Sequence, residues 1–127
     1  MKRLLIFIGL FLIMGACITG CYKDVNLPTP AADPNGPPQQ WSFKKDIAPI
    51  LNTNCALSGC HVAGAQKPVM ETATSYLSLV NGGYVNLLVP NQSKLYIMIN
   101  GNMEEHIPNA ADRKKIYDWI RTGALDN

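Results

Sequence analysis

Two cysteines and a histidine lie within one seven-residue segment, which constrains the fold more than any other feature of the chain. Cys55 and Cys60 are separated by four residues, and His61 follows the second cysteine directly. The backbone between the thiols must bulge outward, and Gly59 can adopt the φ angles that such a bulge requires. The N-terminal leader described below indicates export, and free thiols tend to oxidise in exported proteins. We therefore expect the two thiols to be bridged, bound to a metal or alkylated.

Four kinds of chemistry use cysteines at close spacing. The first is covalent haem attachment, in which each thiol of a C-x-x-C-H segment adds to a vinyl group of the haem and the histidine binds the iron. This chain has the longer form C-x4-C-H. A disulfide between Cys55 and Cys60 would stabilise the fold by roughly 2 kcal/mol, but it would leave His61 without a role. Zinc held by Cys55, Cys60, His61 and His106 has suitable ligand types, although adjacent cysteine and histidine ligands fit one tetrahedral ion poorly. A redox-active dithiol is disfavoured, because thiol oxidoreductases use C-x-x-C.

The first 20 residues resemble the signal peptide of a bacterial lipoprotein. Lys2 and Arg3 precede an apolar run, residues 4–14, that is too short to span a bilayer stably. Residues 18–21 read Ile-Thr-Gly-Cys and resemble a lipobox, which implies cleavage before Cys21 and a lipid on that residue. An uncleaved N-terminal anchor is the alternative. We expect an exported bacterial lipoprotein, anchored in a membrane by its lipid and facing the periplasm or the cell surface.

The remainder divides into a tether and one domain. Residues 21–40 contain five prolines and few apolar side chains, which predicts a semi-rigid linker. Residues 41–127 are expected to form a single domain whose own core is marginal at this size, so that a buried haem would add useful apolar surface. Without Lys2 and Arg3, nine basic and nine acidic side chains remain. Nucleic acid is therefore not an expected partner, since it requires a basic surface.

Apolar spacing in this domain predicts an all-α fold of about four helices. The first helix starts after Ser42 as N-cap, and Pro49 should kink or shorten it. The second spans residues 74–81, the third opens at residues 90–93 and ends near residue 101, and Asn109 caps the last. We expect residues 84–89 to form an extended loop, because no partner strand is evident. The residues expected to point inward are Phe43, Ile47, Ile50, Leu51, Tyr76, Leu77, Val80, Leu95, Tyr96, Ile99, Ile116, Trp119 and Ile120.

The order of motifs over residues 43–124 resembles that of class I-like cytochrome c domains. The matching residues are Phe43, Asp46, Ile47, Pro49, Ile50 and Leu51, then Ser58 to His61, Val89, Pro90, Ser93, Leu95 and Tyr96, and finally Ile116, Trp119, Ile120, Gly123 and Ala124. The resemblance implies one covalently attached haem c, with Cys55 and Cys60 as thioether positions and His61 as the proximal iron ligand. It also implies that the first and last helices cross, with Phe43 near Trp119.

The second iron ligand has two candidates. The family usually supplies a methionine directly before a proline in the loop preceding the last helix, but here Ile107 precedes Pro108. Met103 lies nearer the usual distance from the last helix, and His106 lies closer to the proline. Methionine would favour a higher reduction potential and histidine a lower one, whereas a vacant site would allow small ligands to bind.

The resemblance implies an electron carrier with redox protein partners rather than an enzyme. A haem enzyme or gas sensor with an open distal site and a disulfide-bonded lipoprotein with a binding or structural role are the alternatives. The only basic cluster in the domain is Arg113, Lys114 and Lys115. It could dock an acidic redox partner, but we expect it to be the solvated face of the last helix. The membrane link is expected to come from the lipid rather than from a polybasic patch.

Overall fold

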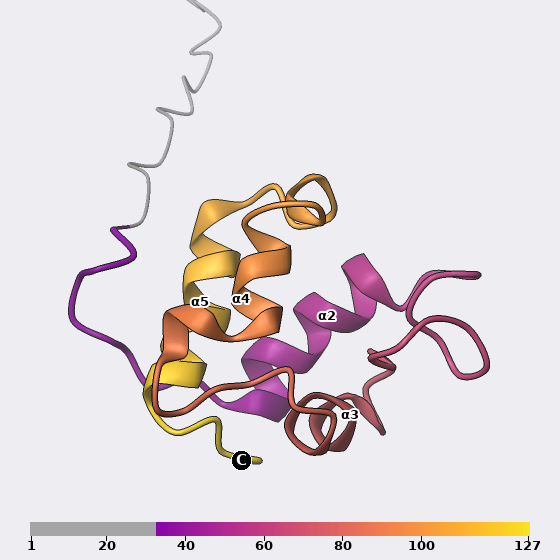
Figure 1. Cartoon of the computed structure of the whole chain (residues 1–127), viewed down its shortest axis with the longest axis horizontal. Helices are drawn as coiled ribbons and strands as arrows, with labels where there is room; N and C mark the ends of the chain where they lie inside the picture. The colour runs from indigo at the N-terminus through magenta and orange to yellow at the C-terminus, as the bar shows by residue number, and fades with distance from the viewer. Residues whose placement is uncertain (1–32) are drawn as a thin grey trace, which may run out of the picture.

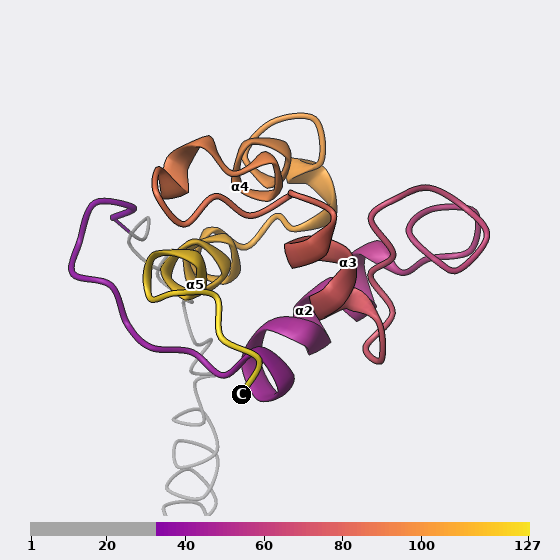
Figure 2. The ribbon, with the colours of Figure 1, turned by 60° about the horizontal axis from the view of Figure 1, so that its bottom comes forward.

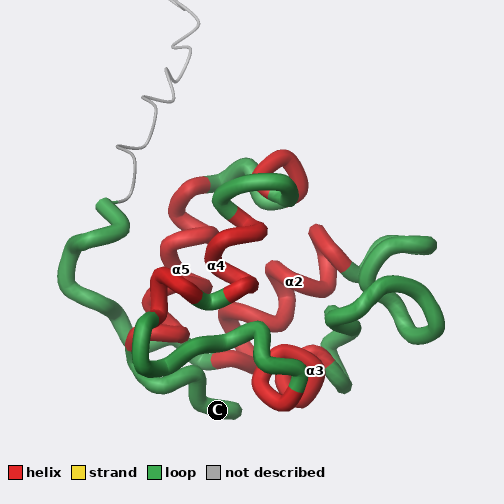
Figure 3. The backbone as a smooth tube through the Cα atoms, in the orientation of Figure 1, coloured by secondary structure: helices red, strands yellow, loops and turns green. Residues whose placement is uncertain are grey.

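The structure is a computed structural model and describes residues 33–127. The expected signal peptide, the expected lipidation site Cys21 and the first part of the expected tether lie outside the described residues. The described part is helical and contains no strand (Figure 3), which confirms the all-α class and the loop at residues 84–89. Its helices are η2 (Phe43–Ile47), α2 (Ala48–Cys55), α3 (Ser75–Asn81), η3 (Pro90–Gln92), α4 (Lys94–Ile99), η4 (Glu104–His106) and α5 (Ala110–Arg121).

The helices form one cluster from which a long loop projects. Helices η2 and α4 both pack against α5, and α3 packs against α2 (Figure 1). The segment between α2 and α3 extends away from the helices, as Figure 2 shows at the right. Within residues 33–127, no helix has the length and apolar character needed to cross a membrane.

The first helix begins at Ser42, as its sequence predicts. The Ser42 Oγ accepts a hydrogen bond from the Lys45 N–H at 3.2 Å, and the Asp46 carboxylate accepts one from the Ser42 N–H at 2.9 Å. These reciprocal bonds satisfy N–H groups that a helix start would otherwise leave unpaired. The opening turn η2 is wound as a π-helix and runs directly into α2, in whose first turn Pro49 lies. Proline has no N–H to donate, so it fits the first turn of α2.

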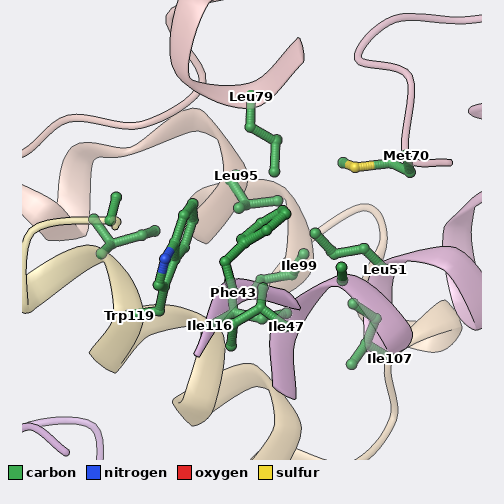
Figure 4. Packing of buried hydrophobic residues seen from close by; sticks show 13 residues of the cluster. Phe43, Ile47, Leu51, Met70, Leu79, Leu95, Ile99, Ile107, Ile116 and Trp119 are labelled. Atoms are coloured by element: carbon green, nitrogen blue, oxygen red, sulfur yellow. The ribbon is translucent and has the colours of Figure 1, made fainter. Parts of the chain in front are cut away.

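An aromatic cluster joins the two ends of the domain. The Phe43 ring lies 5.0 Å from Trp119 and 5.2 Å from Tyr76, measured between ring centroids, and Figure 4 shows Phe43 among the buried aliphatic side chains. The expected contact between the first and last helices is thus confirmed. Asn127 also links the two ends of the domain. Its side-chain oxygen accepts a hydrogen bond from the Phe43 N–H, and its backbone oxygen accepts one from the Lys44 N–H.

The inward face of α3 differs from the prediction at one position. Leu77 was expected inside, but its side chain is 60% exposed and Leu79 is fully buried instead. Ser75 and Leu79, four residues apart, define the buried face of this helix. Leu77 lies about 200° around the helix axis from Ser75, on the opposite side. The prediction for Leu77 was therefore wrong.

The last helix follows its sequence signals closely. The Asn109 side chain accepts a hydrogen bond from the Ala111 N–H, as expected of an N-cap. Ile116, Trp119 and Ile120 are buried. Gly123 follows the helix end with φ +104, a conformation that favours glycine.

Candidate functional site

A cavity of about 410 Å³ lies between the end of α2, the projecting loop, α4 and the segment around η4. Its volume falls within the range of roughly 300–1,000 Å³ found for small-molecule and cofactor sites. The cavity brings together side chains from four separate parts of the chain. All five cysteine, histidine and methionine residues singled out in the domain line it, namely Cys55, Cys60, His61, Met103 and His106.

The loop between the two cysteines has the bulge that its spacing requires. Helix α2 ends at Cys55, and Gly59 adopts φ +79. The Cys60 N–H donates to the Leu57 carbonyl at 2.9 Å, and the His61 N–H donates back to the Cys55 carbonyl at 3.1 Å. These two bonds close the loop, so that both thiols face the same cavity. Both cysteines are free thiols in the structure.

The Cys55 thiol is protonated at neutral pH. Burial raises its pKa to about 11, and the nearby Cys60 thiol adds to this effect. A thiol with such a high pKa is a poor nucleophile at pH 7, because the thiolate is the reactive form. The raised pKa of Cys55 therefore disfavours this thiol as the attacking group of a redox-active dithiol.

His61 is held in one orientation by the chain that follows it. Its Nδ1 lies 2.9 Å from the Pro68 carbonyl oxygen, and this bond requires Nδ1 to carry the proton and donate. Nε2 of the neutral ring then keeps its lone pair available for a metal ion. A bond from the second ring nitrogen to a backbone carbonyl is how metal-binding histidines are commonly oriented. The Met70 N–H also donates to the His61 carbonyl at 2.7 Å, which anchors this part of the loop.

Met103 and His106 reach the cavity from the segment that links α4 to α5. Met103 is half-buried and precedes η4, and its N–H donates to the Met98 carbonyl at 2.8 Å. The His106 side chain is 43% exposed and lies 3.7 Å from the Glu105 carboxylate. Both candidates thus lie at the cavity, with Met103 in the less exposed position.

Among residues 33–127, no three cysteine, histidine or carboxylate side chains are placed where they could together hold a metal ion.

Several cavity-lining residues could not be identified from the sequence. Met70 and Met98 contribute sulfur atoms, and Lys67 and Lys94 contribute ammonium groups. The Lys94 ammonium lies 5.9 Å from the centre of the Tyr84 ring, which also lines the cavity. No local motif marks these positions, since they approach each other only through the packing of α4 against the rest of the fold.

The basic cluster on α5 is not the solvated face that its sequence suggests. The Arg113 and Lys114 side chains are only 12% and 19% exposed. Arg113 pairs with Glu104, Lys114 with Asp118 and Lys115 with Asp112. The expectation of a solvated face was wrong for the first two residues, because acidic partners on the same helix and in the preceding segment hold them against the protein.

Comparison with protein-family models, with curated proteins and with solved structures gave no match. The function therefore has to be inferred from the chemistry of the cavity and the residues that line it.

Proposed function

We propose that this protein is a lipid-anchored monohaem c-type cytochrome that carries single electrons between redox partners at a bacterial membrane. The observation that supports this most is that Cys55, Cys60, His61 and Met103 line one cavity. Two thiols and an oriented imidazole are the groups that covalent haem attachment requires. The resemblance to class I-like cytochrome c domains, in the order of motifs and in the contact of Phe43 with Trp119, agrees with this proposal.

The side chains of the cavity fit a haem. Cys55 and Cys60 would form the thioether bonds, and His61 would bind the iron through Nε2 while Nδ1 donates to the Pro68 carbonyl. Lys67 and Lys94 offer positive charge for the haem carboxylates, and the remaining lining is largely apolar. When bound, the haem supplies the one-electron chemistry. The protein holds the iron ligands, limits access of water and thereby sets the potential.

Met103 is the better candidate for the second ligand. It is half-buried, whereas the His106 ring is 43% exposed and lies beside the Glu105 carboxylate. A methionine ligand is typical of electron-carrying cytochromes c and raises the potential. In this proposal the lipid on Cys21 keeps the domain at the membrane, and its partners are redox proteins rather than small substrates.

A haem stain of the full-length protein tests this function. The protein is produced in a host that matures c-type cytochromes, purified and stained for haem peroxidase activity after a denaturing gel. We expect a stained band at the protein's mass that is absent from the Cys55→Ala/Cys60→Ala variant. Ser58→Ala, in the same loop, is the matched control and should stain like the wild type.

The absence of stain from the wild type would overturn the proposal. Thiol titration of that unstained protein then distinguishes the alternative. Loss of both free thiols, restored by reduction, would indicate a Cys55–Cys60 disulfide and a lipoprotein with a binding or structural role.

A further inference from the structure

Arg113 connects the last helix to the segment that carries both candidates for the second iron ligand. Its Nη1 donates to the Ile107 carbonyl at 2.6 Å and to the Pro108 carbonyl at 2.9 Å. Its Nη2 lies 2.9 Å from the Glu104 carboxylate, and its Nε donates to the Asn100 side chain at 3.2 Å. One guanidinium therefore binds groups at both ends and in the middle of the segment 100–108.

Apart from the bonds of Arg113, this segment is held by backbone hydrogen bonds between residues close in sequence. The Met103 N–H donates to the Met98 carbonyl of α4 at 2.8 Å, and the Glu104 and His106 N–H groups donate to the Gly101 and Met103 carbonyls. Ile107 is its buried apolar anchor, at 1% exposure. A single-turn 3₁₀-helix has poor intrinsic stability, so contacts from outside the turn, including those of Arg113, help to hold the segment that carries Met103.

The chemistry of arginine suits this task better than that of lysine. The guanidinium is planar and always charged, and it presents several donors in fixed directions. The Arg113 side chain is 12% exposed. Its bond to the Ile107 carbonyl is therefore partly shielded from water. The bonds to Asn100, Pro108 and the 52% exposed Glu104 side chain lie at the surface, where water competes with them.

We propose that Arg113 is a positioning residue for the second iron ligand. It holds the segment 100–108 beside the cavity and thereby keeps Met103 in place. This inference rests on the proposed haem function. Arg113 does not contact the cavity itself; it acts through the segment that places Met103 there.

The test compares Arg113→Ala and Arg113→Lys with wild type, all as haem-loaded full-length protein. Lys115→Ala is the matched control on the same helix, because Lys115 pairs with Asp112 and lies over the Trp41 ring. Imidazole is titrated in the dark against the oxidised protein, and its binding is followed by visible absorption. The absorption band of sulfur-ligated iron and the reduction potential are measured on the same samples, and haem stain and circular dichroism verify loading and folding.

In Arg113→Ala we expect imidazole to bind about tenfold more tightly, because displacing Met103 no longer breaks charge-assisted hydrogen bonds. The intensity of the absorption band of sulfur-ligated iron should decrease, and the reduction potential should become lower. Arg113→Lys should recover part of the change, and Lys115→Ala should match wild type. If Arg113→Ala does not fold, Glu104→Gln, which removes one contact and retains the arginine, should shift imidazole binding in the same direction by a smaller factor.

Two outcomes separate this inference from the proposed function. A haem-loaded, folded Arg113→Ala protein with wild-type imidazole affinity, band and potential would overturn the positioning role alone, even if its melting temperature fell. A wild-type protein without haem would overturn the proposed function and this inference with it.

Discussion

Met103 and His106 lie in one short segment, yet their surroundings differ. Both line the cavity, but Met103 is half-buried, whereas the His106 side chain is 43% exposed and lies 3.7 Å from the Glu105 carboxylate. A thioether tolerates burial without a hydrogen-bond partner, whereas an imidazole does not. These surroundings favour Met103 as the second ligand of the proposed haem.

Substitution of each residue tests this assignment. In the haem-loaded protein, Met103→Ala should lower the reduction potential by on the order of 100 mV, since axial ligands shift haem potentials over hundreds of millivolts. His106→Ala should leave the potential and the visible spectrum close to those of wild type. Spectroelectrochemical titration of the two variants provides the measurement. The reverse pattern would assign the site to His106, and no change in either variant would indicate a vacant site.

At the scale of elements, Asp118 links α5 to residues 36–39, which precede the first helix. Its carboxylate is 1% exposed, binds Lys114 and Arg121 from the same helix and accepts a hydrogen bond from the Gln39 N–H. Arg121 also donates to the Gly36 carbonyl, so residues 36–39 lie against this helix. Burial alone would raise the pKa of Asp118, but the bonds from Lys114, Arg121 and Gln39 outweigh it and hold the pKa below 3.8.

This pKa shift predicts how the stability depends on pH. The folded protein binds fewer protons at Asp118 than the unfolded chain does, so the stabilisation is present above pH 3.8 and is lost as the pH falls below it. At pH 7, Asp118→Asn should lower the free energy of unfolding by roughly 2–3 kcal/mol. Urea denaturation at several pH values should show this difference narrowing as the pH falls below 3.8. Asp112→Asn, in a more exposed pair, should cost less than about 1 kcal/mol, and an equal effect of both variants would contradict the prediction.

At the scale of the whole molecule, the cavity lies beside a small core. Thirteen buried apolar residues in the described part of the chain make up that core, and three of them, Met70, Leu95 and Ile99, line the cavity. A domain of this size has little stability to spare. A haem filling the cavity would cover apolar side chains that otherwise face water.

We therefore expect the haem-loaded wild type to melt about 10 °C or more above the haem-free Cys55→Ala/Cys60→Ala variant. A few kcal/mol of ligand stabilisation shifts the melting temperature of a small domain by that amount. Thermal unfolding followed by circular dichroism measures the difference. Ser58→Ala, loaded with haem, controls for changes in the loop. Equal melting temperatures would mean that the fold does not depend on what fills the cavity.

The sequence by itself determined the features that depend on near neighbours. Ser42 and Asn109 cap helices, Pro49 lies in the first turn of α2, and Gly59 permits the bulge between the cysteines. Each of these follows from the conformational limits or hydrogen-bonding groups of one residue and the few beside it. The all-α class and the contact of Phe43 with Trp119 could also be predicted, because the apolar spacing and the order of motifs run through the whole domain.

Only the tertiary structure decided how distant segments meet. The choice of Leu79 over Leu77 as the buried residue of α3 depends on the rotation of that helix against α2. The role of Arg113 depends on the path of the segment 100–108, which places Glu104 and two carbonyls within its reach. The cavity likewise exists because α2, α4 and the projecting loop enclose a space that no single segment defines. Such contacts join residues far apart in the chain, and their geometry is set by the packing of the whole domain rather than by local preference.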